Sequence, residues 1–215
     1  MKNKKIVLAI IIVLIVGFIL AIQSYQKNID ELNQDLVATG GNSLFVKEHS
    51  PSFGENKSNV IITEFIDPEC ESCAAFYPAV KEVFSDYNVE TKLVIRYLAF
   101  HDNSKFAVKL LESARLQNKF KETLEVMFKT QNQWAEHHNP KPELLWILLP
   151  EAGLDMTKLK EDFEKIDVDN ILELDSIDAT TLGVRGTPTF FVNGKKLHEL
   201  SYQALRDLVE SEIYK

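Results

Sequence analysis

Two cysteines three positions apart are the residues of this chain with the most evident chemistry. They form the tetrapeptide Cys70-Glu71-Ser72-Cys73, and the 215-residue sequence holds no other cysteine. An apolar run over residues 60–66 predicts a strand before them, and residues 70–86 follow a helical pattern. Free backbone N–H groups and the helix dipole favour a thiolate at Cys70 in the first turn, and Cys73 lies one turn further on the same face. The pair therefore predicts a reversible dithiol, with metal binding as the main chemical alternative.

The charge and the cysteine content argue against several classes of protein. The formal charge is −8, from 24 basic and 32 acidic residues. Lys2, Lys4 and Lys5 are the only charges before residue 24, so the remainder carries 21 basic and 32 acidic residues. An acidic body argues against non-specific nucleic-acid binding, which needs a basic surface. Two cysteines are too few for a disulfide scaffold or a four-cysteine zinc site.

The N-terminus has the pattern of a membrane anchor. Three lysines among the first five residues precede residues 6–22, which carry no charge. This run is long for a cleavable signal, and residues 20–24 match a small-x-small cleavage site poorly. We expect residues 1–23 to be an uncleaved transmembrane anchor with its lysines in the cytoplasm; a removed signal peptide is the alternative. Both place residues 24–215 outside the cytoplasm, where dithiols are commonly oxidised or kept in exchange.

The rest of the chain divides into a tether and a folded body. Residues 24–57 are expected to form the tether, in which Gly40-Gly41-Asn42-Ser43 breaks a short helical pattern and residues 50–54 form a loop. Strands are expected at 60–66 and 91–99, and a hairpin over 189–200 turns at Asn193-Gly194. Helices are expected at 70–86, 105–117, 120–130, 142–151, 156–165, 168–182 and 202–213. This order predicts an α/β sheet domain that carries a helical subdomain.

Three separate features point to a known family. They are the CxxC pair, Pro78 five residues after Cys73, and Gly186-Thr187-Pro188-Thr189 just before the expected hairpin. With these motifs, residues 58–213 resemble the thioredoxin superfamily, and within it the DsbA-like oxidoreductases that carry a helical insertion. The resemblance implies a thioredoxin fold over residues 58–215. Its core would be residues 58–100 and 183–215, with a helical insertion at about 101–182, between the second strand and the cis-proline loop.

The resemblance also implies a role for five residues. Cys70 would be the nucleophile that forms a mixed disulfide with a partner, and Cys73 would resolve it. Glu64 would carry the proton of the inner cysteine; a partly exposed glutamate at the strand end is the alternative. Pro188 would be a cis proline, with a trans-proline turn as the alternative. Thr187 would border the reactive sulfur, where this loop would offer its backbone to an extended substrate.

The residues around Cys70 set an expectation for its pKa. The carboxylates of Glu69 and Glu71 flank it and disfavour a thiolate. The most oxidising members of the family place Pro-His between their cysteines, and that histidine supports the thiolate. Here the dipeptide is Glu71-Ser72. We therefore expect the pKa of Cys70 to lie below that of a free cysteine but not at the acidic extreme.

A metal site is the more distant interpretation of the same residues. His101, His137 and His138 could complete a copper or zinc site with the two thiolates. The two adjacent histidines stand at an expected helix end, where surface or capping roles are more usual. The aromatic side chains of the insertion are expected to form its core rather than a ligand cage: Phe106, Phe120, Phe128, Trp134 and Trp146.

The sequence thus predicts a membrane-tethered, extracytoplasmic thiol–disulfide oxidoreductase, which would be periplasmic if the signal were cleaved. Its substrates would be extended polypeptides, and oxidation of their thiols is the expected direction. No cofactor, metal or nucleic acid is expected. The resemblance implies reoxidation by a quinone-linked membrane partner. A disulfide reductase or isomerase is the nearer alternative, because Cys70 has acidic neighbours and lacks the histidine; a copper- or zinc-binding module is the other.

Overall fold

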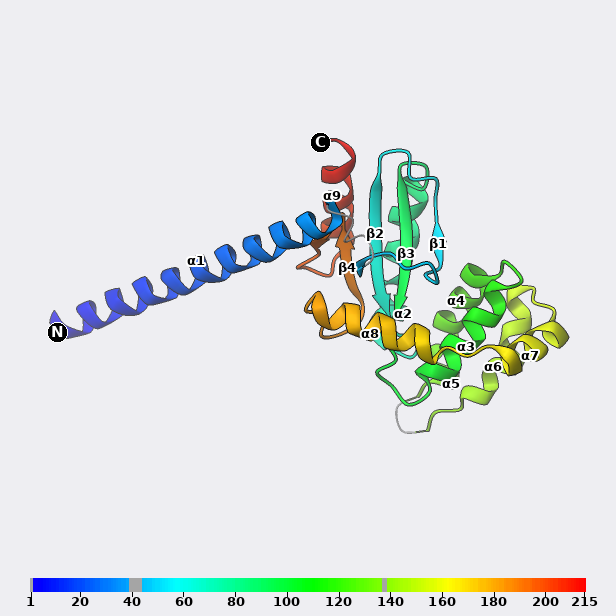
Figure 1. Ribbon diagram of the computed structural model, residues 1–215. Coiled ribbons are helices and arrows are strands. Elements are labelled where there is room, and N and C mark those ends of the chain that lie inside the picture. The colour runs from blue at the N-terminus through cyan, green and yellow to red at the C-terminus, as the bar shows by residue number, and fades with distance from the viewer. Residues whose placement is uncertain (1, 39–43, 137–138) are drawn as a thin grey trace.

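A five-stranded mixed sheet forms the centre of the folded domain (Figure 1). The computed structural model describes residues 2–38, 44–136 and 139–215. The strands are β1 (Ser52–Phe53), β2 (Val60–Ile66), β3 (Thr91–Tyr97), β4 (Thr189–Val192) and β5 (Lys195–Lys196). They lie in the order β1-β3-β2-β4-β5, with β2 and β3 parallel and the other neighbouring pairs antiparallel. The predicted α/β class is confirmed.

Alternation along β2 sends its side chains into two different layers. Ile62 and Ile66 point to the face covered by α2 (Glu71–Asp86) and α9 (Tyr202–Ile213), where they join the larger apolar core. Phe65 packs on the opposite face, in a second core cluster with Ala179 of α8 (Asp169–Thr181). Because both faces are covered, β2 and β3 are buried along nearly their whole length, as is typical of parallel strands.

A helical subdomain lies beside one end of the sheet (Figure 1). Its elements are α3 (Ser104–Arg115), α4 (Phe120–Lys129), α5 (Gln131–Trp134), η2 (Pro142–Leu144), α6 (Leu145–Leu148), η3 (Leu149–Ala152) and α7 (Met156–Lys165). Phe120, Phe128 and Trp134 are buried in its core, as predicted, and Phe106 and Trp146 pack edge-on against each other. The single helix expected at 142–151 is instead three short pieces. Pro142 is the first residue of one 3₁₀ turn and Pro150 the second residue of the other, and a proline cannot donate a helical hydrogen bond.

Several predicted boundaries differ from the structure. Residues 50–54 were expected to form a loop, but Ser52–Phe53 pair with β3 as β1. The second arm of the hairpin is two residues long rather than six, and its turn has positive φ angles at Asn193 and Gly194, as a tight hairpin turn requires. The first helix of the domain begins at Glu71, one residue later than expected. These are differences at element ends and leave the order of the long elements unchanged.

The N-terminal helix α1 (Lys2–Ala38) extends away from the domain (Figure 1). Its stretch Ile10–Asn28 has a mean hydropathy of 1.9 and is wholly exposed. By length and composition alone it could cross a membrane, and a signal sequence would pass the same test. Helix α1 also runs through the first part of the expected tether, whereas the break expected at Gly40–Ser43 lies outside the described residues.

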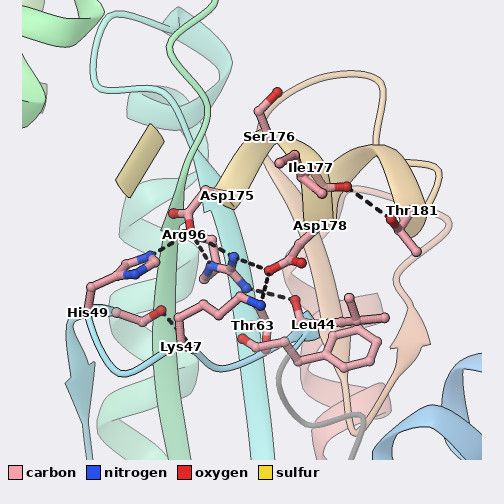
Figure 2. Close-up of polar contacts among 12 residues, drawn as sticks. Leu44, Lys47, His49, Thr63, Arg96, Asp175, Ser176, Ile177, Asp178 and Thr181 are labelled. Carbon is pink, nitrogen blue, oxygen red and sulfur yellow. Dashed lines mark hydrogen bonds and ion pairs between the residues drawn. The ribbon is translucent and has the colours of Figure 1, made fainter. Parts of the chain in front are cut away.

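A buried ionic cluster ties the segment after this break to the domain (Figure 2). Arg96 of β3 is fully buried; its guanidinium bonds Asp175 of α8 at 2.8 Å, Asp178 at 2.6 Å and the carbonyl oxygen of Leu44 at 2.7 Å. His49 lies 2.7 Å from Asp175. The later part of the expected 24–57 tether therefore packs on the domain, and a buried Phe45 side chain accompanies it.

Candidate active site

Cys70 stands at the junction of strand and helix. It is the N-cap residue of α2, with φ −76° and ψ 120°, and its backbone N–H donates to the Asp67 carbonyl oxygen at 3.0 Å. Cys73 lies in the first turn of α2 and is 1% exposed, whereas Cys70 is partly exposed. Both cysteines are free thiols. One sulfur can therefore meet a partner from outside, and the other cannot.

The two thiols titrate in opposite directions. The pKa of Cys70 is lowered to about 5, and a hydrogen bond from the Cys73 side chain is the largest cause. Hydrogen bonds from the Thr187 side chain and from the backbone N–H groups of Ser72 and Cys73 lower it further, whereas burial opposes the shift. Those backbone groups are the free donors of the helix N-terminus. Burial raises the pKa of Cys73, and its hydrogen bond with Cys70 adds to the rise. At neutral pH the outer sulfur is a thiolate, and the inner one keeps its proton.

The loop before β4 lies against the outer sulfur. The Thr187–Pro188 peptide bond is cis, as expected from the resemblance. Cys70 Sγ lies 3.4 Å from the carbonyl oxygen of Thr187. Antiparallel pairing of β4 with β2 brings this loop there, because Thr189 pairs with Phe65 near the end of β2 that leads to Cys70. Two sites separated by more than a hundred residues of sequence thus meet at one edge of the sheet.

Glu64 lies under the active-site helix. As an even-numbered residue of β2 it shares the face of Ile62 and Ile66, toward α2, and it is only 4% exposed. Burial raises the pKa of Glu64 to about 8. The charge of Glu64 contributes to the raised pKa of Cys73, so the two groups interact. A small cavity of about 40 Å³ borders Glu64 and Tyr77, which is room enough for a water molecule.

Asp67, directly after β2, organises the loops on this edge. Its Oδ1 accepts hydrogen bonds from the Glu69 N–H at 2.9 Å and the Ser104 hydroxyl at 2.5 Å. Its Oδ2 accepts from the Phe100 N–H at 2.9 Å and lies 2.8 Å from His101 Nδ1. Sequence reasoning passed over Asp67. A usable signal was present, because residues that follow two parallel strands must meet at the same sheet edge.

Glu69 does not act on Cys70 as expected. Its carboxylate accepts hydrogen bonds from the backbone N–H and the side-chain amide of Asn103, at 2.8 and 2.9 Å, and is turned toward that loop. Neither Glu69 nor Glu71 is among the main contributions to the pKa of Cys70. Hydrogen-bond donors are thus the main cause of the lowered pKa, and the value of about 5 falls between a free cysteine and the acidic extreme, about 3.5, as expected.

Comparison with known proteins agrees with this geometry. Residues 47–211 match the model of a family described as thioredoxin. The chain belongs to this thioredoxin family. Its sequence is 28% identical over 151 residues to a Na(+)/H(+) antiporter NhaA of Herminiimonas arsenicoxydans, covering 70% of this chain and 23% of that protein. It is 27% identical over 163 residues to a candidate protein-disulfide oxidoreductase of Rickettsia typhi, covering 73% of this chain and 59% of that protein.

The thioredoxin fold is also the fold of solved structures. A thioredoxin-like oxidoreductase from Silicibacter pomeroyi superposes with a TM-score of 0.68 at 23% identity, covering 81% of this chain and 98% of that one. At this identity the likeness shows the fold. The chain spans less than two thirds of the length of either relative named above, so the match does not assign the activity of either relative to this chain.

Of the three histidines of the alternative copper or zinc site, only His101 lies among the described residues. His101 bonds Asp67 through Nδ1, and His137 and His138 lie outside the described residues. Within the part of the chain that the structure describes, no group of three or more histidine, cysteine or acidic side chains could hold a metal ion. Cys70 lies against Thr187, and the charge of Glu64 acts on Cys73.

Proposed function

We propose that this chain is an extracytoplasmic thiol–disulfide oxidoreductase of the DsbA type that oxidises thiols of polypeptides through Cys70 and Cys73. The observation that carries the proposal is the contrast between the two thiols: an accessible one with a pKa of about 5 and a buried one whose pKa is raised. Exchange chemistry needs this contrast, because only a thiolate attacks or leaves readily. The name of the Rickettsia relative points the same way.

The proposed cycle begins with a disulfide between the two cysteines. A substrate thiolate attacks Cys70 Sγ, the S–S bond breaks, and Cys73 leaves with the bond's electron pair and takes up a proton. A second substrate thiolate then attacks the substrate sulfur of the mixed disulfide and releases Cys70 as a thiolate. Two electrons pass from the substrate dithiol to the protein. Because the low pKa of Cys70 makes it a good leaving group, oxidation of the substrate is the favoured direction.

Glu64 is proposed to supply the proton that Cys73 takes up. A buried carboxyl group with a pKa of about 8 is largely protonated at neutral pH and can release its proton again. The adjoining cavity would let a water molecule return that proton from solvent. Neither step needs a metal or an organic cofactor.

Thr187 and Pro188 are proposed to hold the substrate. The Thr187 carbonyl oxygen beside Cys70 would accept a backbone hydrogen bond from an extended peptide whose cysteine reaches the sulfur. Residues 1–23 are proposed to anchor the domain at the outer face of a membrane. A quinone-linked membrane protein is proposed as the oxidant that restores the Cys70–Cys73 disulfide.

A trapping experiment tests the exchange chemistry. In Cys73→Ser, Cys70 keeps the backbone N–H donors of the helix that lower its pKa. No second thiol is left to resolve its mixed disulfide. When the reduced variant is incubated with an oxidised peptide, we expect a stable covalent adduct on non-reducing gels and in mass spectra. The matched variant Cys70→Ser should form none. Equal adduct formation by both variants, or by neither, would contradict the proposal.

A further inference from the structure

His101 is a titratable neighbour of the active site that lies outside the CxxC tetrapeptide. It follows β3, its Nδ1 is 2.8 Å from Asp67 Oδ2, and its side chain is 35% exposed. Asp67 itself is fully buried, and three further donors hold its carboxylate in place. The imidazole is therefore held at Nδ1, and its side chain remains partly exposed.

Asp67 also connects His101 to both cysteines. Its carbonyl oxygen accepts the Cys70 N–H at 3.0 Å, and its own backbone N–H donates to the sulfur of Cys73. Partial burial lowers the pKa of His101, but the hydrogen bond to Asp67 and the charges of Asp67, Glu69 and Cys70 outweigh that effect and raise it. An interaction between two charges acts on both, so a thiolate that favours the imidazolium is favoured by it in return.

We propose that His101 is a positioning residue whose imidazolium, held on Asp67, stabilises the Cys70 thiolate from outside the CxxC tetrapeptide. Without the imidazolium, the buried carboxylate of Asp67 would have no compensating cation on the loop that follows β3. Asp102, the other titratable residue of that loop, is exposed. The proposal rests on the function proposed above. In this proposal His101, which follows β3, takes the part that a histidine between the two cysteines would otherwise play: its positive charge stabilises the thiolate.

The first test removes the charge and keeps the hydrogen bond. In His101→Asn the amide nitrogen takes the position of Nδ1 and can still donate to Asp67. We expect the thiolate absorbance of the reduced variant to titrate at higher pH than in the unchanged protein. The equilibrium constant with glutathione should shift about threefold toward the protein disulfide, the size expected for one partly screened charge near the protein surface. An unchanged titration would overturn the proposal.

A second histidine that is paired with a buried aspartate serves as a control for a general loss of stability. His49 forms an equally close pair with a buried aspartate, at 2.7 Å through Nε2, in the ionic cluster on the other face of the sheet. His49→Gln keeps a donor at that nitrogen and removes the imidazole ring. It should lower stability and leave the Cys70 titration where it was. An equal shift in both variants would mean that His101 acts only through the fold.

A third measurement needs no variant. If the thiolate and the imidazolium stabilise each other, the His101 ring should titrate at lower pH in the disulfide form, where the thiolate is lost, than in the dithiol form. Proton NMR of the two forms measures this directly, and identical titrations would overturn the proposal even if His101→Asn does not fold. None of these readouts uses a substrate, so the proposed oxidase activity can fail while the His101 effect stands, and the reverse.

Discussion

At the scale of single residues, position on one helix makes two identical side chains chemically different. Cys70 caps α2 and receives its free N–H groups, whereas Cys73 is enclosed by the core one turn later. Burial penalises the charged form of any thiol, and only Cys70 has enough donors to overcome that penalty. The difference between the two residues, more than the CxxC spacing itself, is what supports exchange chemistry.

The alkylation rate of the reduced protein should report the pKa of Cys70. Because the thiolate is the reactive form, the rate with iodoacetamide should rise through a midpoint near pH 5 and be level by pH 7. The same depressed pKa stabilises the folded, reduced protein. This contribution to the free energy of unfolding is fully present above the pKa of a free cysteine and is lost as the pH falls through about 5. Cys70→Ser should abolish the rate. A midpoint near that of free cysteine, about 8.5, would contradict the proposed thiolate.

Glu64 should make stability depend on pH. Its pKa rises from 4.5 in the unfolded chain to about 8 in the fold, so the folded state holds a proton that the unfolded state releases. Stability is therefore full below pH 4.5 and is lost as the pH rises through about 8. For the disulfide form, whose cysteines do not titrate, we expect the free energy of unfolding in urea to fall by roughly 3 kcal/mol between pH 5 and pH 8.

The matched variants separate this effect from the rest of the protein's titration. Glu64→Gln should flatten the profile and, in exchange assays, change its pH dependence. Glu82→Gln, an exposed glutamate on α2, should leave the profile unchanged. A Glu64→Gln profile that still falls with the slope of the unchanged protein would show that Glu64 is not the buried acid.

At the scale of elements, a cluster of buried charges joins three segments far apart in sequence. Figure 2 shows Arg96 of β3 between Asp175 and Asp178 of α8, with Lys47 and His49 reaching in from the segment before β1. A buried pair adds little net stability, but removal of one partner leaves a charge without compensation. The cluster thus fixes where this segment and α8 lie against the sheet.

Removal of Asp175 should therefore be costly. It compensates the charge of Arg96, lies 2.7 Å from His49 Nε2, and accepts the Tyr97 N–H at 2.7 Å. We expect Asp175→Ala to lower the free energy of unfolding by about 3 to 5 kcal/mol in urea denaturation. Lys57→Ala breaks an ion pair with Glu55 that is fully exposed, and should cause no measurable change. Similar effects of the two substitutions would contradict the role of the cluster.

The elements that the sequence revealed are those with long patterns. β2 and β3 are seven-residue strands with mostly apolar side chains, and the apolar side chains of the amphipathic helices α3, α4, α7 and α9 recur every three to four residues. β1 was missed because two residues between Pro51 and Gly54 have no period. The Asp67–His101 contact was missed because it joins two loops that only the sheet brings together. Patterns along the chain predict elements, and contacts between loop ends need the topology.

At the scale of the whole molecule, the chain combines a folded domain with one long exposed helix. The family match begins at residue 47, and the ionic cluster already holds Leu44. The apolar stretch Ile10–Asn28 makes no buried contact with the domain. The part that we propose to do the chemistry and the part that we propose to meet the membrane are thus separate along the chain.

Removal of residues 1–43 tests this separation. We expect the shortened protein to be soluble, to unfold at the same urea concentration as the detergent-solubilised full chain, and to exchange disulfides at an equal rate. The full chain should stay with membranes after carbonate extraction, and mass spectrometry of that fraction should find residues 1–23 still attached. Release of the full chain by carbonate would refute the anchor, and a cleaved N-terminus would favour a signal peptide.

The direction of the chemistry is the central claim, and the reduction potential of the Cys70–Cys73 couple tests it most directly. Equilibration of the purified domain with glutathione buffers of known ratio gives that potential. Because a stabilised Cys70 thiolate favours the reduced form, we predict a value above about −180 mV, between protein disulfide isomerase and DsbA. A value near that of thioredoxin, about −270 mV, would contradict an oxidase and indicate a disulfide reductase instead.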